Sequence, residues 1–197
     1  MFTGIIESMA KIIGITPKGS NITFRLSSTL ASEFKPDQSI SHNGCCLTVE
    51  VVGDAWYEVT AIDETLKKSN LGLCKINDYL NIERSMQLGA RLDGHLVQGH
   101  VDGVGTCVAI EPLDGSTLFS FNYPEAFKKL IVEKGSICLN GISLTVFNCT
   151  DNFFTVGIIP YTLSHTNMSA LKIGDPVNLE FDILGKYVQR NLINHVS

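Results

Sequence analysis

The chain has 197 residues, of which 44% are hydrophobic and 18% charged, so a packed core is available and wholesale disorder is excluded. Its net charge of −5 gives no electrostatic footprint for nucleic acid or an anionic membrane surface. No apolar run approaches the roughly 18 residues that a membrane span needs, and no basic N-terminal start marks a secretory signal, so we expect a cytosolic protein.

The first half reads mostly as short strands. Residues 12–15, 21–26, 46–52, 56–62 and 79–83 are rich in β-branched and aromatic residues and partly alternate between apolar and polar. Turn sequences stand at Pro17-Lys18-Gly19 and at Gly53-Asp54. A short helix is expected at residues 64–71.

The second half repeats this pattern. Strands are expected at residues 103–110, 117–122, 136–139, 144–149, 153–159 and 176–181, with hairpin turns at Asp114-Gly115 and Asp151-Asn152. Pro124 is expected to open a helix that runs to Val132, and a further short helix is expected at residues 161–171. Many short, regularly spaced strands favour small antiparallel barrels.

The tail after Gly185 carries Val188, Leu192 and Val196 on one helical face, with Tyr187 and Ile193 beside it. A helix of about twelve residues is marginal alone, so it needs a docking surface. Its own barrel and a partner chain are equally suitable.

The chain contains itself twice. Asn43-Gly44-Cys45-Cys46-Leu47-Thr48-Val49 returns as Asn140-Gly141-Ile142-Ser143-Leu144-Thr145-Val146, a shift of 97 residues. At the same shift, eight of the nineteen positions in 65–83 are identical in 162–180, where about one match is expected by chance. A weaker echo joins residues 2–7 to 97–102. The chain is therefore expected to form two similar domains, 1–86 and 87–185, followed by the helical tail 186–197.

The six cysteines, at positions 45, 46, 74, 107, 138 and 149, show neither C-x-x-C pairs nor zinc-ligand spacing with histidine. His95 and His100 lie five residues apart without a nearby third ligand in the sequence. We therefore expect free thiols and no metal site.

Four motifs resemble one family. The start Met-Phe-Thr-Gly-Ile-Ile, the two Asn-Gly motifs at 43–49 and 140–146, and Gly-His-Leu-Val-Gln-Gly-His-Val-Asp-Gly at 94–103 occur together, in order, as in riboflavin synthase. The resemblance covers essentially the whole chain. It implies an all-β fold with short helices: two six-stranded antiparallel Greek-key barrels in tandem plus a C-terminal trimerisation helix.

The resemblance also implies an activity. The family's enzyme moves a four-carbon unit between two molecules of 6,7-dimethyl-8-ribityllumazine, giving riboflavin and 5-amino-6-ribitylaminouracil, without metal or cofactor. Its members are homotrimers whose sites form between barrels of different subunits, and association with lumazine synthase is a further expectation. The chemistry requires a proton to leave the C7 methyl of one lumazine and a nucleophile to add at C7 of the other.

The resemblance implies catalytic roles for Cys46, Ser143, His100, Thr145 and Asp182. In the first half, the positions that match the family's ligand-binding pattern are Gly4, Ile5, Ile6, Cys46, Leu47, Thr48, Thr60, Ala61, Ile62, Asp63, Glu64 and Thr65, with Ser39 as a nearby candidate. In the second half they are Gly99, His100, Val101, Lys134, Ser143, Leu144, Thr145, Ile159, Pro160, Tyr161, Thr162, Leu163 and Ser164. Because strand side chains alternate, Cys46 and Thr48 are expected on one face, and Ser143 and Thr145 on the equivalent face.

Each of these residues also has a structural interpretation. Cys46 fits a small buried hydrophobe, and the hydroxyls fit partners of backbone groups at strand ends. His100 fits a turn, Lys134 a solvated helix-end cation, and Asp182 a surface carboxylate. Residues 63–65 read first as a helix N-terminus. Relatives often have Asp where this chain has Asn140, and the match to Asn43 favours a turn-shaping role there.

The main alternative function is a non-catalytic lumazine or flavin carrier, of the kind that serves luminous bacteria as an optical antenna. Fold and duplication do not separate an enzyme from a carrier. The retained Cys46, Ser143, Thr145 and His100 favour the enzyme. A reductase-like flavoprotein is disfavoured because no glycine-rich dinucleotide fingerprint follows a strand.

Overall fold

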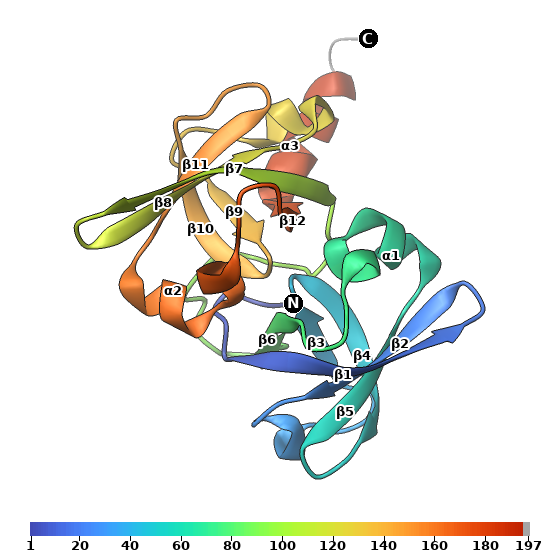
Figure 1. Ribbon diagram of the computed structural model, residues 1–197. Coiled ribbons are helices and arrows are strands. Elements are labelled where there is room, and N and C mark those ends of the chain that lie inside the picture. The colour runs from blue at the N-terminus through green and yellow to red at the C-terminus, as the bar shows by residue number, and fades with distance from the viewer. Residues whose placement is uncertain (195–197) are drawn as a thin grey trace.

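The computed structural model describes residues 1–194, and it consists of two closed barrels followed by a helix (Figure 1). The first barrel is built from β1 (Ser8–Lys18), β2 (Asn21–Ser27), β3 (Ser39–His42), β4 (Cys45–Val52), β5 (Trp56–Ala61) and β6 (Tyr79–Arg84). Its strands close in the order β1-β2-β5-β4-β3-β6, and neighbouring strands are antiparallel.

The second barrel repeats this topology. Its strands are β7 (Gly103–Leu113), β8 (Ser116–Asn122), β9 (Ser136–Leu139), β10 (Ile142–Phe147), β11 (Phe153–Ile158) and β12 (Pro176–Phe181), in the cyclic order β10-β11-β8-β7-β12-β9. The expected pair of six-stranded antiparallel barrels is confirmed. The first-half reading had missed β3, a four-residue strand between turns, although its counterpart 136–139 was predicted.

Short helices lie between the strands. The two repeats carry equivalent pairs, α1 (Asp63–Lys68) with η2 (Asn70–Leu73), and α2 (Pro160–His165) with η4 (Asn167–Ala170), while η1 spans Ala31–Glu33. The helix expected from Pro124 to Val132 is instead a 3-10 helix, η3 (Glu125–Leu130), with Pro124 as its N-cap. The C-terminal helix α3 spans Ile183–Asn194, so it begins before Gly185, and Val196 lies outside the described residues.

Alternation within the strands separates the core from the outer walls. On β4, Cys45, Leu47 and Val49 are buried in the first barrel, whereas Thr48 is exposed and Cys46 half-buried. Large side chains such as Phe24 and Tyr57 fill the interior. The barrels are therefore packed cores, and any ligand must bind on their outer walls.

Asparagines hold the two barrels together around an approximate two-fold axis. Asn43 and Asn140 adopt positive φ angles of 47° and 45°, so their turn-shaping role is confirmed. The Asn43 Oδ1 atom accepts from Asn81 N of its own barrel (2.8 Å) and from Asn167 Nδ2 of the other (2.9 Å). The Asn140 Oδ1 atom accepts from Asn178 N (2.8 Å) and Asn70 Nδ2 (3.2 Å) in the equivalent way. This network fixes one barrel relative to the other.

Candidate active site

The outer wall of the first barrel carries a row of small polar side chains. Cys46 faces Ser41 and Thr48 faces Ser39 across the β3–β4 ladder. The neighbouring strand β5 pairs with β4 from Val49 onward, beyond the positions of Cys46 and Thr48. The expectation that Cys46 and Thr48 share a face is confirmed.

The second barrel presents the equivalent row on β10. Ser143 faces Cys138 and Thr145 faces Ser136 across the β9–β10 ladder. Ser143 is half-buried and Thr145 exposed, as are their counterparts Cys46 and Thr48. The two walls therefore have the same geometry, with a hydroxyl in place of a thiol.

Two segments cross between the barrels and meet these rows. Gly4 O accepts from Ser143 N at 2.8 Å, and Gly99 O accepts from Cys46 N at 2.8 Å. Both glycines have positive φ angles, 79° and 81°. A Cβ atom on Gly4 would lie 2.5 Å from Ser143 Cβ, and one on Gly99 would lie 2.6 Å from Cys46 Cβ. Only glycine fits this conformation and this close approach.

The crossing changes how the predicted site residues are grouped. Gly4, Ile5 and Ile6 belong to the first half of the sequence, yet Ile6 packs against the core of the second barrel. Conversely, Val101 packs against the core of the first barrel, and His100 directly follows the glycine that touches Cys46. Ile5, by contrast, lines a hollow of the first barrel, so the crossing segment 4–6 touches both barrels, which the repeat alone does not show.

His95 was missed as a site residue. Its Nδ1 atom lies 2.7 Å from Ser143 Oγ, and its side chain is buried. Burial lowers the pKa of His95, while the charge of nearby Asp182 opposes this shift. His95 lies before residues 97–102, where the match to residues 2–7 begins, so the first half has no residue that corresponds to it. The duplication therefore gave no signal for His95. The imidazole therefore gives Ser143 a partner that nothing equivalent in the sequence supplies to Cys46.

Of the remaining candidates, Asp182 and Lys134 lie around the second wall, whereas His100 follows Gly99 beside the first wall. Asp182 caps α3, because its Oδ1 atom accepts from Leu184 N at 2.9 Å. Lys134 is exposed in a left-handed turn, with its ammonium 5.1 Å from the ring centre of Phe147, which follows Thr145 on the same face of β10. His100 is exposed, and its backbone N–H donates to Glu180 Oε2 at 2.7 Å.

The stretches 60–65 and 159–164 join a strand end to a helix start in each repeat. Ile62 and Ile159 are 53% and 57% exposed just before α1 and α2, and Asp63 begins α1 as the sequence predicted. Leu47, Ala61, Leu144 and Leu163 instead pack in or against the barrel cores, so their side chains do not form the outer wall. The rest of the two stretches lies at these strand–helix junctions: Thr60, Glu64, Thr65, Pro160, Tyr161, Thr162 and Ser164.

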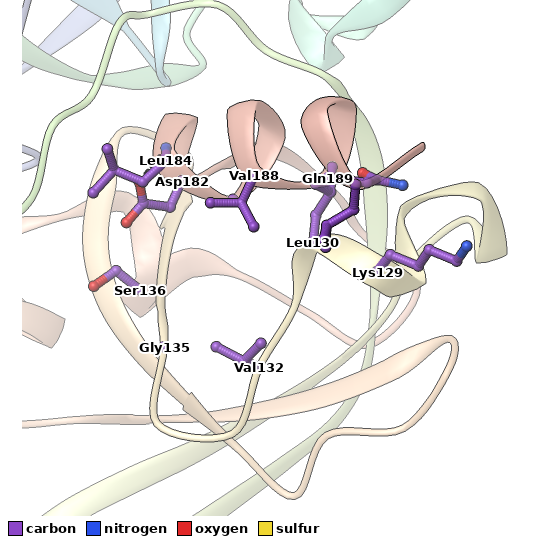
Figure 2. A pocket seen from close by; sticks show the side chains of 11 residues that line it. Lys129, Leu130, Val132, Gly135, Ser136, Asp182, Leu184, Val188 and Gln189 are labelled. Atoms are coloured by element: carbon purple, nitrogen blue, oxygen red, sulfur yellow. Dashed lines mark hydrogen bonds between the residues drawn. The ribbon is translucent and has the colours of Figure 1, made fainter. Parts of the chain in front are cut away.

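A hollow lies beside each pair of facing hydroxyls. The second barrel has a cavity of about 720 Å³, lined by Ser136, Asp182, Leu130 and Val132, and covered by Leu184 and Val188 of α3. Figure 2 shows the side chains of α3 on one side of this cavity and those of Val132 and Ser136 on the other.

The first barrel has a hollow of about 620 Å³ at the equivalent place, lined by Ser39, Ile5, Glu33, Lys35 and Arg84. The pair Ser39/Ser136 is related by the repeat shift of 97 residues, as are Glu33/Leu130 and Lys35/Val132. Two related hollows of similar size, one charged and one apolar, therefore accompany the two polar rows.

Within residues 1–194, no three His, Cys, Asp or Glu side chains gather as metal ligands do, and no helix is long and apolar enough to cross a membrane.

Comparison with known proteins agrees with this architecture. The lumazine-binding domain family matches residues 3–85 and, again, 98–182. Riboflavin synthase of Actinobacillus pleuropneumoniae is 40% identical over 98% of this chain and 90% of its own length. That of Mycobacterium tuberculosis (strain H37Rv) is 39% identical over 96% and 97%.

Among solved structures, LumP complexed with riboflavin aligns with a TM-score of 0.86 over 92% of this chain and 99% of its own, at 20% identity. LumP complexed with 6,7-dimethyl-8-(1'-D-ribityl) lumazine aligns with a TM-score of 0.82, also at 20% identity, over 91% and 98%. At this identity the likeness supports the fold alone. Two matches to the domain model and near-full-length relatives at about 40% identity place this chain in the riboflavin synthase family, whose members are transferases.

Proposed function

We propose that the chain converts two molecules of 6,7-dimethyl-8-ribityllumazine into riboflavin and 5-amino-6-ribitylaminouracil, with one molecule on each kind of barrel wall. The observation that carries this proposal is the pair of equivalent polar rows, each completed by a glycine from the other repeat. A reaction between two identical molecules needs two related sites. The products together contain every atom of the two substrates, so no external oxidant or reductant is consumed.

The second wall is suited to proton transfer. Burial lowers the pKa of His95 and so favours its neutral form, and the ring forms a hydrogen bond with Ser143. A neutral imidazole can accept or pass a proton through a hydroxyl within hydrogen-bond distance. Lys134 offers an exposed cation beside Phe147, on the strand that carries Thr145, for the negative charge that develops when the C7 methyl loses its proton.

The first wall offers a thiol at the equivalent position. Cys46 is half-buried on the outer face, beside Gly99 and with the exposed His100 next along the crossing segment. A thiol or hydroxyl can add to an electron-poor ring carbon and leave again. The thiol–hydroxyl difference therefore supports unlike roles for the two bound molecules, one as donor and one as acceptor of the four-carbon unit.

We propose that the two rings are aligned between walls that belong to different chains. Helix α3 is anchored to its own barrel by the Lys186–Asp102 ion pair of 2.6 Å, yet Tyr187, Val188 and Leu192 stay 66%, 59% and 61% exposed. We propose that these side chains pack against other copies of α3 in a homotrimer. A chain ending at residue 182 should sediment as a monomer and lose most turnover; a trimeric, active truncated chain would disprove this role.

The activity test uses the purified chain and the lumazine alone, in buffer with a chelator. Riboflavin formation is followed by its absorbance and fluorescence, and the pyrimidine product by mass spectrometry in equal amount. Tight binding of the lumazine without conversion would instead identify a carrier. We further propose that the reaction takes place in the cytosol, because free thiols at all six cysteines suit a reducing compartment.

A further inference from the structure

Two buried carboxylates hold the segments that cross between the barrels. Glu83, on β6 of the first barrel, is only 4% exposed. Its Oε1 atom accepts from Thr3 N (2.7 Å) and Thr3 Oγ1 (2.8 Å), and its Oε2 atom accepts from Gly4 N (2.9 Å). The carboxylate thus binds the segment directly beside the glycine that touches Ser143.

Glu180 does the same on β12 of the second barrel. It is 2% exposed, and it accepts from Gln98 N (2.6 Å), Gly99 N (2.9 Å) and His100 N (2.7 Å). Glu83 and Glu180 are related by the repeat shift of 97 residues. The same device therefore occurs twice, each time on the segment that meets the other barrel.

The chemistry of these contacts requires a carboxylate. Each carboxylate accepts three hydrogen bonds from N–H or O–H groups, so both of its oxygens must act as acceptors. Burial raises the pKa of both carboxyls, and the donors of the bound segments oppose that shift. A glutamine would keep one acceptor and place an amide N–H₂ group against backbone donors, so the segment would lose at least one hydrogen bond and gain a repulsive contact.

We propose that Glu83 and Glu180 are positioning residues, each fixing the segment that completes the active-site wall of the opposite barrel. Glu180 places Gly99 against Cys46 of the first barrel, and Glu83 places Gly4 against Ser143 of the second. This proposal depends on the proposed function only for the identity of the molecule that the walls bind. The geometry itself is testable without any substrate.

The thiol of Cys46 reports on the first wall. Glu180→Gln is expected to raise the rate of Cys46 alkylation by iodoacetamide about tenfold, the factor that loss of one hydrogen bond to a charged group produces. Fragmentation of the peptides in tandem mass spectrometry separates Cys46 from the adjacent, buried Cys45. The half-buried Cys74 and Cys149 serve as internal controls whose rates should stay unchanged. Glu83→Gln is the matched control, because it leaves the Cys46 wall intact.

The second wall is tested in a Ser143→Cys background, where the introduced thiol is the reporter. Here Glu83→Gln should raise the alkylation rate of that thiol about tenfold, and Glu180→Gln should leave it unchanged. Reciprocal selectivity supports the proposal. An equal rise at every cysteine would show general loosening, and no change at either reporter would show that the segments hold their places without the carboxylates; both outcomes overturn it.

Steady-state kinetics separate this proposal from the proposed function. With the lumazine as substrate, each glutamine variant is expected to lower kcat while the midpoint of thermal unfolding moves little. If the unchanged chain binds lumazine without converting it, the proposed function fails, but the alkylation result still decides the roles of Glu83 and Glu180.

Discussion

The two barrels share one topology and differ where each meets solvent or ligand. Beside the first hollow, Arg84 forms ion pairs with Glu7 (2.6 Å) and Glu33 (2.7 Å). At the positions of Glu33 and Arg84, the second barrel has Leu130 and Phe181, with α3 lying over its hollow. After duplication, the turns and ladders stayed alike while the charge of the two hollows diverged. The two walls therefore offer different surroundings to a molecule of the same kind.

The interiors of the two barrels differ at two positions whose side chains contact each other. In the first barrel His42 Nδ1 donates to Ile40 O (3.0 Å), which leaves Nε2 to accept from the Tyr57 hydroxyl (2.8 Å). The second barrel has Leu139 and Phe154 at the positions of His42 and Tyr57. Both polar groups are present together or absent together, because a buried hydroxyl or imidazole without its partner is costly.

The largest effect is expected from this buried pair. Burial lowers the pKa of His42 from 6.5 to about 4, so between these values the unfolded chain binds a proton that the folded chain does not. The stability contributed by neutral His42 is fully present above pH 6.5 and falls by roughly 3 kcal/mol as the pH drops to about 4. The double variant His42→Leu/Tyr57→Phe, which copies the second barrel, should lose less stability in acid.

Urea unfolding at about pH 7 and about pH 4 measures this difference in the free energy of unfolding. Glu83 and Glu180 act with the opposite sign, since burial raises their pKa, so the double variant must be compared with the unchanged chain at each pH. An equal loss in both proteins would contradict the role of His42.

The second prediction breaks one crossing contact. Gly99→Ala would place a Cβ atom 2.6 Å from Cys46 Cβ, displacing the segment and lowering kcat about 100-fold, the cost of an ångström-scale misplacement. Gly115→Ala is the matched control, because Gly115 also has a positive φ of 92° but no atom of the described residues within 4 Å of its added Cβ. Equal activity in the two variants would show that the close approach is unimportant.

The third prediction concerns the thiol that distinguishes the first wall. Cys46→Ser makes the two polar rows alike and is expected to lower kcat about tenfold, or 1.4 kcal/mol of transition-state stabilisation. Thermal unfolding should change little, because Cys46 is only half-buried and serine is nearly isosteric. Retained turnover with reduced stability would show that Cys46 serves packing and not catalysis.

The smallest effect is expected at His95. His95→Asn keeps a polar atom near Ser143 but removes the titrating ring, so kcat should fall about fivefold, the scale of one hydrogen bond. In the unchanged chain, activity should fall in acid as His95 becomes protonated. The midpoint of this fall should lie below pH 6.5, because burial lowers the pKa of His95. In the variant, the acidic side of the pH–activity curve should fall less. An unchanged pH profile in His95→Asn would show that His95 does not act in the site.

Much of the fold was readable from local sequence. Alternation along residues 46–52 predicts which side chains share a strand face. The Asn-Gly turns at 43–44 and 140–141 predict the backbone angles there. Both features depend only on neighbouring residues. The sequence missed β3 because Ser39-Ile40-Ser41-His42 has one apolar residue, whereas the predicted counterpart Ser136-Ile137-Cys138-Leu139 has three. It missed the true start of α3 because Gly185 weakens the local helix signal. The correspondence between Cys46 and Ser143 was also readable, since the repeat aligns them.

By itself, the sequence determined two similar barrels, the faces of their strands and the thiol–hydroxyl difference between them, because these depend on side-chain periodicity and on the repeat. Only the tertiary structure decided that Gly4 meets Ser143 and Gly99 meets Cys46, and that His95 reaches Ser143. These contacts join residues about 50 to 140 positions apart. They form because the Asn network and the buried Glu83 and Glu180 set the barrels and the crossing segments in place, and no local pattern records such an arrangement.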